Sequence, residues 1–298
     1  MKTRLGIFVA TLLLLPLAGI YLNDLSWDAF FSNTASADGN IAATLFTSLA
    51  LLGYLLLTNH LVHQFTGNNL LSAQRNYFIA VTAASALLGW LFAYLNLYTH
   101  NWMPQQQQNL ITQLLLYTPP FALLAPAVLL TRALISTLPG VLKSLAVGIA
   151  VPAPSNETLV FTLMPLAFLG LLGGAVWPAT LFWLLWLAPL LLLLGLQLLW
   201  NENTIFSDLP NGNWGRVICA ALAGIIVGNL AVITYQGQGG DLAINLPHPL
   251  LAQPGYGVFG LLCLQLGDVL ASPWHGKKRG DLFRQKKKFP IPVVVKKD

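Results

Sequence analysis

Side chains able to do chemistry are scarce in the apolar stretches of this chain. Asp268 is the one carboxylate that falls within such a stretch, about a turn from its end. Gln113, Asn229 and Gln265 are neutral polar groups within such stretches, where they could bond one helix to another. Ionisable groups inside a membrane mark pathways or pair with one another. For Asp268 we favour an ion pair with Arg216 or with the basic C-terminal residues.

A polar pathway is the alternative use of these groups. Pro119 and Pro120 interrupt the stretch that contains Gln113, and each proline removes a backbone donor and clashes with the preceding turn. We therefore expect a kink or an unwound turn there, a feature that lines substrate sites in many transporters. Such a pathway would be lined by Gln113, Pro119, Pro120, Asn229 and Asp268. The scarcity of ionisable groups argues against transport coupled to protons or sodium.

A metal site is suggested by one pattern only. His60 and His63 form His-x-x-His, which would place both imidazoles on one helical face. A metal needs further ligands, and no third His, Cys or carboxylate lies near them in the sequence. Cys219 and Cys263 both fall within apolar stretches, where a buried free thiol is the simplest interpretation. We therefore predict no metal, no cofactor and no catalytic residue.

The string from Gly267 to Arg279 contains Asp268, Ser272 and a run of cations. It resembles the start of the signature of phosphatidate cytidylyltransferases and related lipid-nucleotide enzymes. The resemblance implies an acid that helps to hold a metal and cations that meet phosphates. The chain departs from the signature at Pro273, lacks its later His-Gly-Gly and Asp-Arg-x-Asp parts, and has no second acidic cluster for a two-metal site.

Apolar stretches dominate the chain and must position all of these groups. The sequence of 298 residues is 56% hydrophobic and only 8% charged, whereas soluble domains carry roughly 25% charged residues. We therefore predict an all-α integral membrane protein, a bundle of about eight transmembrane helices. Residues 1–275 are the predicted transmembrane domain, and residues 276–298 are a basic cytoplasmic tail. The predicted helices are 5–22, 41–58, 77–98, 110–132, 159–177, 179–200, 216–235 and 256–272.

The distribution of charge predicts the orientation of this bundle. When the chain is threaded through the predicted helices, every Lys and Arg falls on the side that holds the N-terminus. The connections on the other side carry Asp24, Asp28, Asp38 and Asp241 and no cation. Cytoplasmic connections carry the excess of Lys and Arg. Both termini are therefore predicted in the cytoplasm (N-in/C-in), in the inner membrane of a bacterial cell.

Small residues at helical spacing predict close packing on two helices. Gly170 and Gly174 are four residues apart in one, and Ala220, Gly224 and Gly228 share a face of another. Small residues let two helix backbones approach each other. The simplest interpretation is packing within this chain, and the functional one is a contact face for another membrane subunit.

The tail adds a candidate contact with lipid. Clusters of cations beside a membrane helix bind anionic headgroups, and the net charge of +5 arises mostly there. We expect membrane lipids, and no nucleic acid, to be the partners of these cations. The predicted headgroup contacts are Lys277, Lys278, Arg279, Arg284, Lys286, Lys287 and Lys288.

Three classes of function remain. The first is a non-catalytic accessory or scaffold subunit that engages partner membrane proteins or lipids, which should show an exposed groove of small residues and no polar pocket. The second is a transporter or channel for an uncoupled or lipid-like substrate, which should show a polar cavity lined by the pathway residues. The third is a lipid-modifying enzyme, which should gather Asp268, His60, His63 and arginines in one pocket at the inner face.

Overall fold

The computed structural model describes residues 38–104, 110–152, 154–200, 202–240, 242–246 and 248–271. The predicted first helix at 5–22 and the predicted tail at 276–298 lie outside the described residues. The predicted orientation, with both termini in the cytoplasm, therefore stays a prediction.

Seven helices of the described residues are long and apolar enough to cross a membrane. In a bilayer each backbone group must find its partner within the protein, and a helix satisfies all of them within one segment. The predicted all-α, multi-pass membrane fold is thus confirmed. The seven are α3 (Asp38–Thr66), α5 (Arg75–Thr99), α6 (Leu110–Ser136), α8 (Asn156–Val176), α9 (Pro178–Leu199), α10 (Gly215–Gly237) and α11 (Ala252–Ala271).

Short elements connect these helices. Helices α4 (Leu70–Ala73) and α7 (Pro139–Leu145) follow α3 and α6. Two 3₁₀ turns, η1 (Leu209–Asn211) and η2 (Pro249–Leu251), precede α10 and α11. Strands β1 (Trp102–Pro104) and β2 (Leu242–Ile244) pair antiparallel, with Trp102 opposite Ile244.

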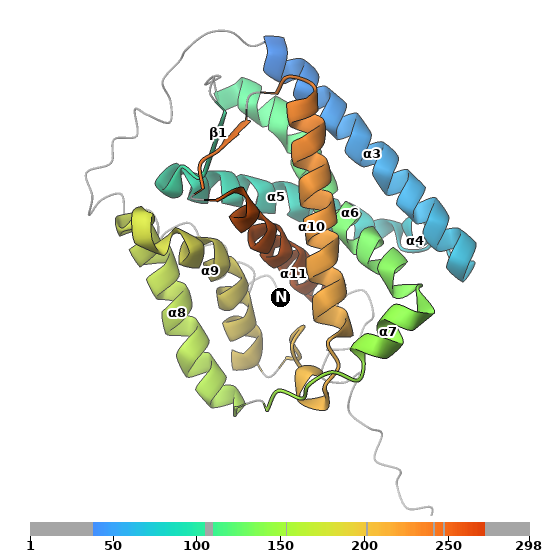
Figure 1. Cartoon of the computed structure of the whole chain (residues 1–298), viewed down its shortest axis with the longest axis vertical. Helices are drawn as coiled ribbons and strands as arrows, with labels where there is room; N and C mark the ends of the chain where they lie inside the picture. The colour runs from blue at the N-terminus through green and yellow to red at the C-terminus, as the bar shows by residue number, and fades with distance from the viewer. Residues whose placement is uncertain are drawn as a thin grey trace, which may run out of the picture.

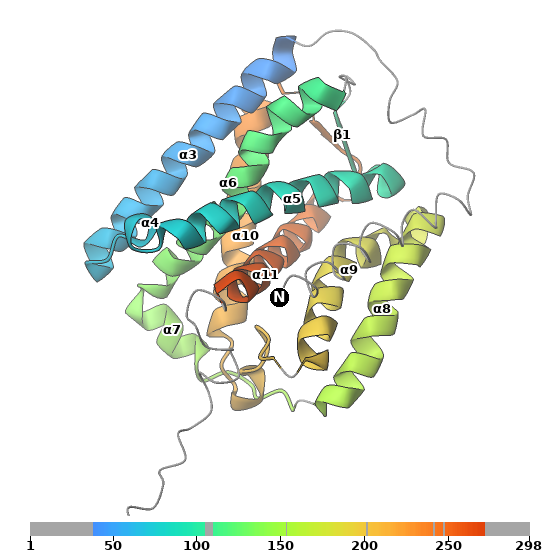
Figure 2. The same cartoon turned by 180° about the vertical axis from the view of Figure 1, so that it is seen from behind.

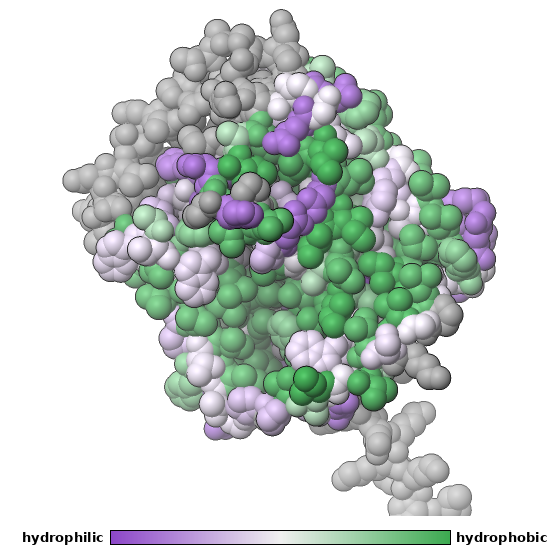
Figure 3. All heavy atoms as spheres, in the orientation of Figure 1, coloured by the Kyte–Doolittle hydropathy of each residue, from purple (hydrophilic) through white to green (hydrophobic). Residues whose placement is uncertain are grey.

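Four helices form the middle of the bundle. Helices α5, α6, α10 and α11 pack on one another, as views from the two sides show (Figures 1 and 2). Helix α3 lies along one side, against α6 and α10. The α8–α9 hairpin lies on the opposite side, where α9 contacts α5 and α11. Apolar side chains cover much of the visible face, and hydrophilic ones gather in its upper part and at its edges (Figure 3).

The predicted inner loop at 59–76 is wrong for most of its length. Helix α3 continues to Thr66, and α4 follows within the same segment. Asn59, which is buried, explains the tight connection. Its amide donates to Asn69 Oδ1 at 3.0 Å and accepts from the backbone of Leu71 at 3.2 Å. The polar side chains of this segment therefore belong to helix α3 and to hydrogen bonds that hold α4 against it. They do not form the solvated loop that their polarity suggested.

The prediction for Pro119 and Pro120 was a kink or an unwound turn. The unwound turn is wrong, because α6 runs without a break from Leu110 to Ser136, and the kink stays a prediction. A neighbouring helix stabilises this region. The hydroxyl of Ser85, on α5, donates to the carbonyl of Phe121 at 2.5 Å and accepts from the amide of Ala125 at 2.9 Å. A regular helical turn would join those two backbone groups directly. A side chain inserted at such a point is an established cause of helix bending.

The connections that follow α5 and α10 are joined by a two-stranded sheet. Strand β2, which follows α10, pairs with β1, which follows α5. Asn245 donates its backbone amide to the carbonyl of Asn101 at 2.7 Å beside this sheet. The two connections therefore fasten the ends of α5 and α10 to each other.

Candidate functional site: a charged cluster at one end of the bundle

Four helices bring charged and hydroxyl groups together at one end of the bundle. Tyr77 lies in the first turn of α5, and Arg216 in the first turn of α10. Arg132 lies about a turn before the end of α6, and Asp268 about a turn before the end of α11. Because α5 and α10 begin where α6 and α11 end, all four residues lie at the same end. The sheet of β1 and β2 follows the other ends of α5 and α10.

The centre of this cluster is an ion pair. Arg216 Nη2 lies 2.5 Å from Asp268 Oδ2, and the two side chains are 26% and 20% exposed. The interpretation of Asp268 as the partner of Arg216 is thus confirmed. Charged groups within a membrane helix are costly unless they are paired, so the pair accounts for the one carboxylate of the predicted pathway.

Arg132 extends the cluster. Its Nε atom is buried and has no hydrogen-bond partner among the described residues. Its guanidinium is repelled by Arg216 and attracted by Asp268. Sequence reasoning used Arg132 only to predict orientation. The predicted helix ended at Arg132, so nothing in the sequence indicated that α6 continues to Ser136 and carries this arginine about a turn inside its end.

Tyr77 forms the wall of the cluster on the side of α5. Its hydroxyl lies 2.7 Å from the point that a Cβ atom on Gly267 would occupy. Gly267 therefore lets the tyrosine hydroxyl reach the backbone of α11 beside Asp268. A larger side chain at this position would push Tyr77 out of the cluster.

The predicted small-residue faces lie inside the protein. A Cβ on Gly170 would lie 2.7 Å from the carbonyl oxygen of Leu184, and one on Gly174 would lie 2.6 Å from Leu185 Cβ. Both glycines therefore permit the close contact between α8 and α9. A tight turn joins these two helices at Trp177, where the sequence predicted a hairpin.

The second small-residue face packs α10 on α11. Ala220 is fully buried. A Cβ on Gly224 would lie 2.7 Å from the Cα of Gly260, and one on Gly228 would lie 2.6 Å from Tyr256 Cγ. These glycines are therefore occupied by contacts within the chain, and no exposed groove of small residues forms along this face.

The predicted pathway residues do not converge. Asn229 of α10 and Gln253 of α11 form a reciprocal pair, with hydrogen bonds of 2.7 and 2.9 Å between their amide groups. Gln113 lies in the first turn of α6, at the end of the bundle opposite Asp268. Pro119 and Pro120 lie within continuous helix. The structure thus places these groups at separate levels of the bundle.

The histidines lie apart from the charged cluster. His60 and His63 are exposed on α3, and His60 Nε2 lies 2.9 Å from the side-chain amide of Gln64. Among the described residues no group of three His, Cys, Asp or Glu side chains could hold a metal ion. Cys219 and Cys263 are both buried and free, as predicted.

Two glutamines are buried in the bundle, and the role of neither one was predicted from the sequence. Gln265 is fully buried, and its Oε1 accepts from the backbone amide of Ile205 at 2.9 Å. It thereby holds the α9–α10 connection inside the bundle. Gln197, near the end of α9, is 3% exposed, and neither polar atom of its side chain has a hydrogen-bond partner. A lone glutamine in a leucine-rich stretch gave no sign of this burial.

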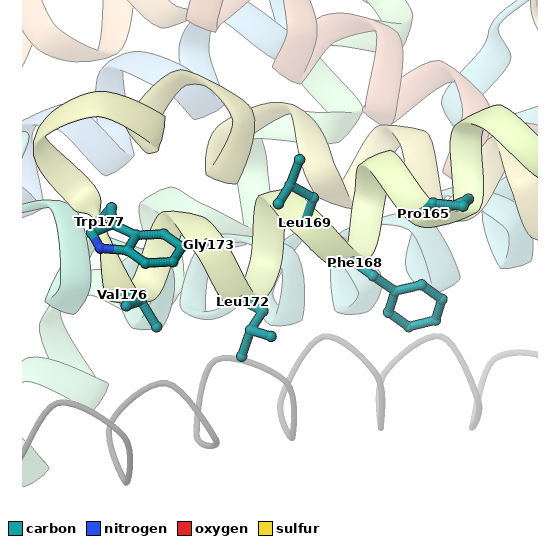
Figure 4. Close-up of a pocket in the computed structure, with 7 residues that line it drawn as sticks. All are labelled: Pro165, Phe168, Leu169, Leu172, Gly173, Val176 and Trp177. Carbon is teal, nitrogen blue, oxygen red and sulfur yellow. The ribbon is translucent and has the colours of Figure 1, made fainter.

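A groove lies along α8, apart from the charged cluster (Figure 4). Its volume is about 560 Å³, and its lining is almost wholly apolar. Such a lining suits an acyl chain or an apolar helix better than a polar solute. The groove is lined by Pro165, Phe168, Leu169, Leu172, Gly173, Val176 and Trp177.

The predicted headgroup contacts from Lys277 to Lys288 lie outside the described residues. The charged cluster formed by Tyr77, Arg132, Arg216 and Asp268 is therefore the site that the structure itself offers. Comparison of the chain with protein-family models, with curated proteins and with solved structures returned no significant match.

Proposed function

We propose that this protein is a non-catalytic accessory or scaffold subunit of a bacterial inner membrane, where it engages partner membrane proteins or lipids. In this proposal both termini face the cytoplasm, and the charged cluster lies at the inner leaflet. The basic tail adds contacts with anionic headgroups, which attract cations close to the membrane surface.

One observation supports this function best: polar side chains between helices bond one helix to another. The Asn229–Gln253 pair joins α10 to α11. Tyr54 of α3 bonds to Thr131 of α6 at 2.8 Å. Such bonds fasten a bundle, whereas a transport pathway needs polar groups that face a cavity. Asn229 is the clearest example. A transport pathway would need its side-chain amide to face a cavity, but this amide is hydrogen-bonded to Gln253.

A lipid-modifying enzyme is the second candidate, and one observation favours it. Asp268 and two arginines do gather at one end of the bundle. His60 and His63 do not join them, and Asp268 is held by Arg216. The ion pair thus occupies the carboxylate that a catalytic acid or base would use. The cluster therefore suits binding of an anion better than acid–base catalysis.

Purification of the full chain in a mild detergent tests the proposed function. We expect a defined membrane protein or a defined lipid to co-purify at a constant ratio. Vesicles that contain the chain should be as tight to small neutral solutes as empty vesicles. A chain that purifies alone and makes vesicles leak, with a leak that Asn229→Ala changes, would replace the scaffold by a transporter.

A further inference from the structure

Among the described residues, the charged cluster contains one more cation than anion. Arg132 and Arg216 carry positive charge, and Asp268 supplies the carboxylate. Arg216 is paired with this carboxylate, but the buried Nε of Arg132 has no acceptor in the part of the chain that the structure describes. A buried guanidinium donor without an acceptor is costly in a membrane-spanning helix, and an anion can supply the acceptor.

The depth of the cluster indicates where such an anion comes from. Arg132 is four residues, or about 6 Å, from Ser136 at the end of α6. Arg216 follows the first residue of α10, and Asp268 is three residues from the end of α11, so both lie within one turn of a helix end. Lipid headgroups lie at this level, because the helix ends reach the boundary of the hydrocarbon layer. The partial exposure of Arg216 and Asp268 leaves one edge of the cluster open to this layer.

We propose that Arg132 and Arg216 together bind a phosphate group, which is the headgroup phosphate of an anionic phospholipid or a free phosphate ion. This inference deepens the proposed function, on which it rests, because it names the ligand that the scaffold holds. Guanidinium groups present a planar set of donors that matches phosphate oxygens and can bond to two of them at once.

Each residue of the cluster has a distinct part in this site. Arg132 supplies the Nε donor that has no acceptor among the described residues, and Arg216 is oriented by Asp268. The Tyr77 hydroxyl, beside Gly267, is a further donor within the cluster. One surplus positive charge matches one phosphodiester, which carries a single negative charge. This balance favours a phospholipid such as phosphatidylglycerol over a free phosphate dianion.

Lipid titration of the purified full chain, followed by native mass spectrometry, tests the proposal. The probes are phosphatidylglycerol, phosphatidylcholine and inorganic phosphate, each added separately. The variants are Arg132→Gln and Arg132→Lys. The matched control is Arg75→Gln, because Arg75 is an exposed arginine at the start of α5, two residues from Tyr77. Thermal unfolding of each variant shows whether it is folded.

We expect wild type and Arg75→Gln to bind phosphatidylglycerol more tightly than phosphatidylcholine. Arg132→Gln should bind it about tenfold more weakly, because hydrogen bonds between charged groups typically contribute this much or more. Arg132→Lys should fall between the two, since it keeps the charge and loses the planar fork. Inorganic phosphate that stabilises wild type but not Arg132→Gln, without preference for phosphatidylglycerol, would assign the site to the free ion.

Asp268→Asn separates binding from a purely structural role. Without the carboxylate the cluster has two uncompensated cations, so the variant should be less stable in detergent alone. Phosphatidylglycerol should bind it more tightly and restore its stability. Loss of stability that the lipid does not restore would contradict the proposal.

The inference and the proposed function fail in different ways. If Arg132→Gln binds both lipids and phosphate as Arg75→Gln does, the phosphate site is refuted. Partner proteins that still co-purify in that case would leave the scaffold function standing. Wild type that binds phosphatidylglycerol through Arg132 but makes vesicles leak would keep the site and refute the scaffold.

Discussion

Replacement of Gly224 by alanine is the sharpest test of how the bundle is packed. Helices α10 and α11 touch backbone to backbone at this position, where Gly224 faces Gly260. A Cβ on Gly224 would lie 2.7 Å from the Cα of Gly260 and closer still to the carbonyl oxygen of Tyr256. No rotamer change can relieve a clash with backbone atoms, so the two helices must move apart.

The size of the effect follows from that movement. The helices must separate until the new methyl group reaches ordinary van der Waals contact, which begins at 3.4 Å. Overpacking of this kind costs about 1–3 kcal/mol. Alanine recovers up to about 1 kcal/mol through its higher helix propensity. We expect Gly224→Ala to lower the free energy of unfolding by about 1–2 kcal/mol, and Gly224→Leu to prevent the pairing of α10 with α11.

Unfolding in mixed detergent micelles, followed by circular dichroism, measures this change. Gly53→Ala on α3 and Gly255→Ala on α11 are matched controls, because nothing lies within 4 Å of a Cβ at either position. The double variant Gly224→Ala with Gly260→Ala should cost less than the two single variants together, since one separation relieves both clashes. If Gly224→Ala is as stable as the controls, α10 and α11 do not touch as described.

Three other predictions concern hydrogen bonds and topology. Ser85→Ala should lower the free energy of unfolding by about 1 kcal/mol, measured in the same unfolding assay. Ser48→Ala, which loses only a hydrogen bond within its own helix, should lower it by less. Equal losses would contradict the hydrogen bonds from Ser85 to α6. Asn229→Leu and Gln253→Leu should each lower the free energy of unfolding by about 0.5–2 kcal/mol. The double variant should lower it by less than the sum of the two single variants. Additive losses would contradict the hydrogen-bonded pair. Reporter fusions after residues 30, 104, 178 and 245 should be external, and those after 67, 150, 208 and 298 cytoplasmic; an external C-terminus would refute the orientation.

A fifth prediction concerns the tail. The isolated peptide 276–298 should bind vesicles that contain phosphatidylglycerol, because cations near an anionic leaflet each contribute about 1 kcal/mol. Its binding should weaken steeply between low and physiological salt, since salt screens exposed charges. A peptide in which the seven cations from Lys277 to Lys288 are replaced by glutamine is the control. Equal binding of the peptide to charged and to neutral vesicles would refute the predicted contact between the tail and anionic headgroups.

Several features of the fold could be predicted from local sequence alone. Long apolar stretches form helices in a membrane because no other open structure satisfies their backbone groups. The turn at Trp177 was predictable because Pro178 has no amide to donate and fits the first turn of a helix. The pairing of Asp268 with Arg216 followed from the scarcity of charge, since a lone carboxylate in a membrane must find a cation.

Other features depend on which helices meet, and spacing along one helix does not reveal this. The faces of Gly170 and Gly224 were recognisable as packing faces, but only the bundle shows that α9 and α11 cover them. Pro119 and Pro120 predicted a break, yet Ser85 reaches α6 from a position 36 residues away from Phe121. Local propensity was overridden here by a bond between helices.

The charged cluster also combines features that the sequence predicts with features that depend on the tertiary structure. The sequence by itself predicts that cations collect on one side of the membrane, because the insertion rule acts on each connection separately. Only the tertiary structure decided that Arg132 lies beside Arg216 and Asp268. Electrostatic energy depends on the distance between charges in space, and the distance from Arg132 to Asp268 is set by the packing of α6 against α10 and α11.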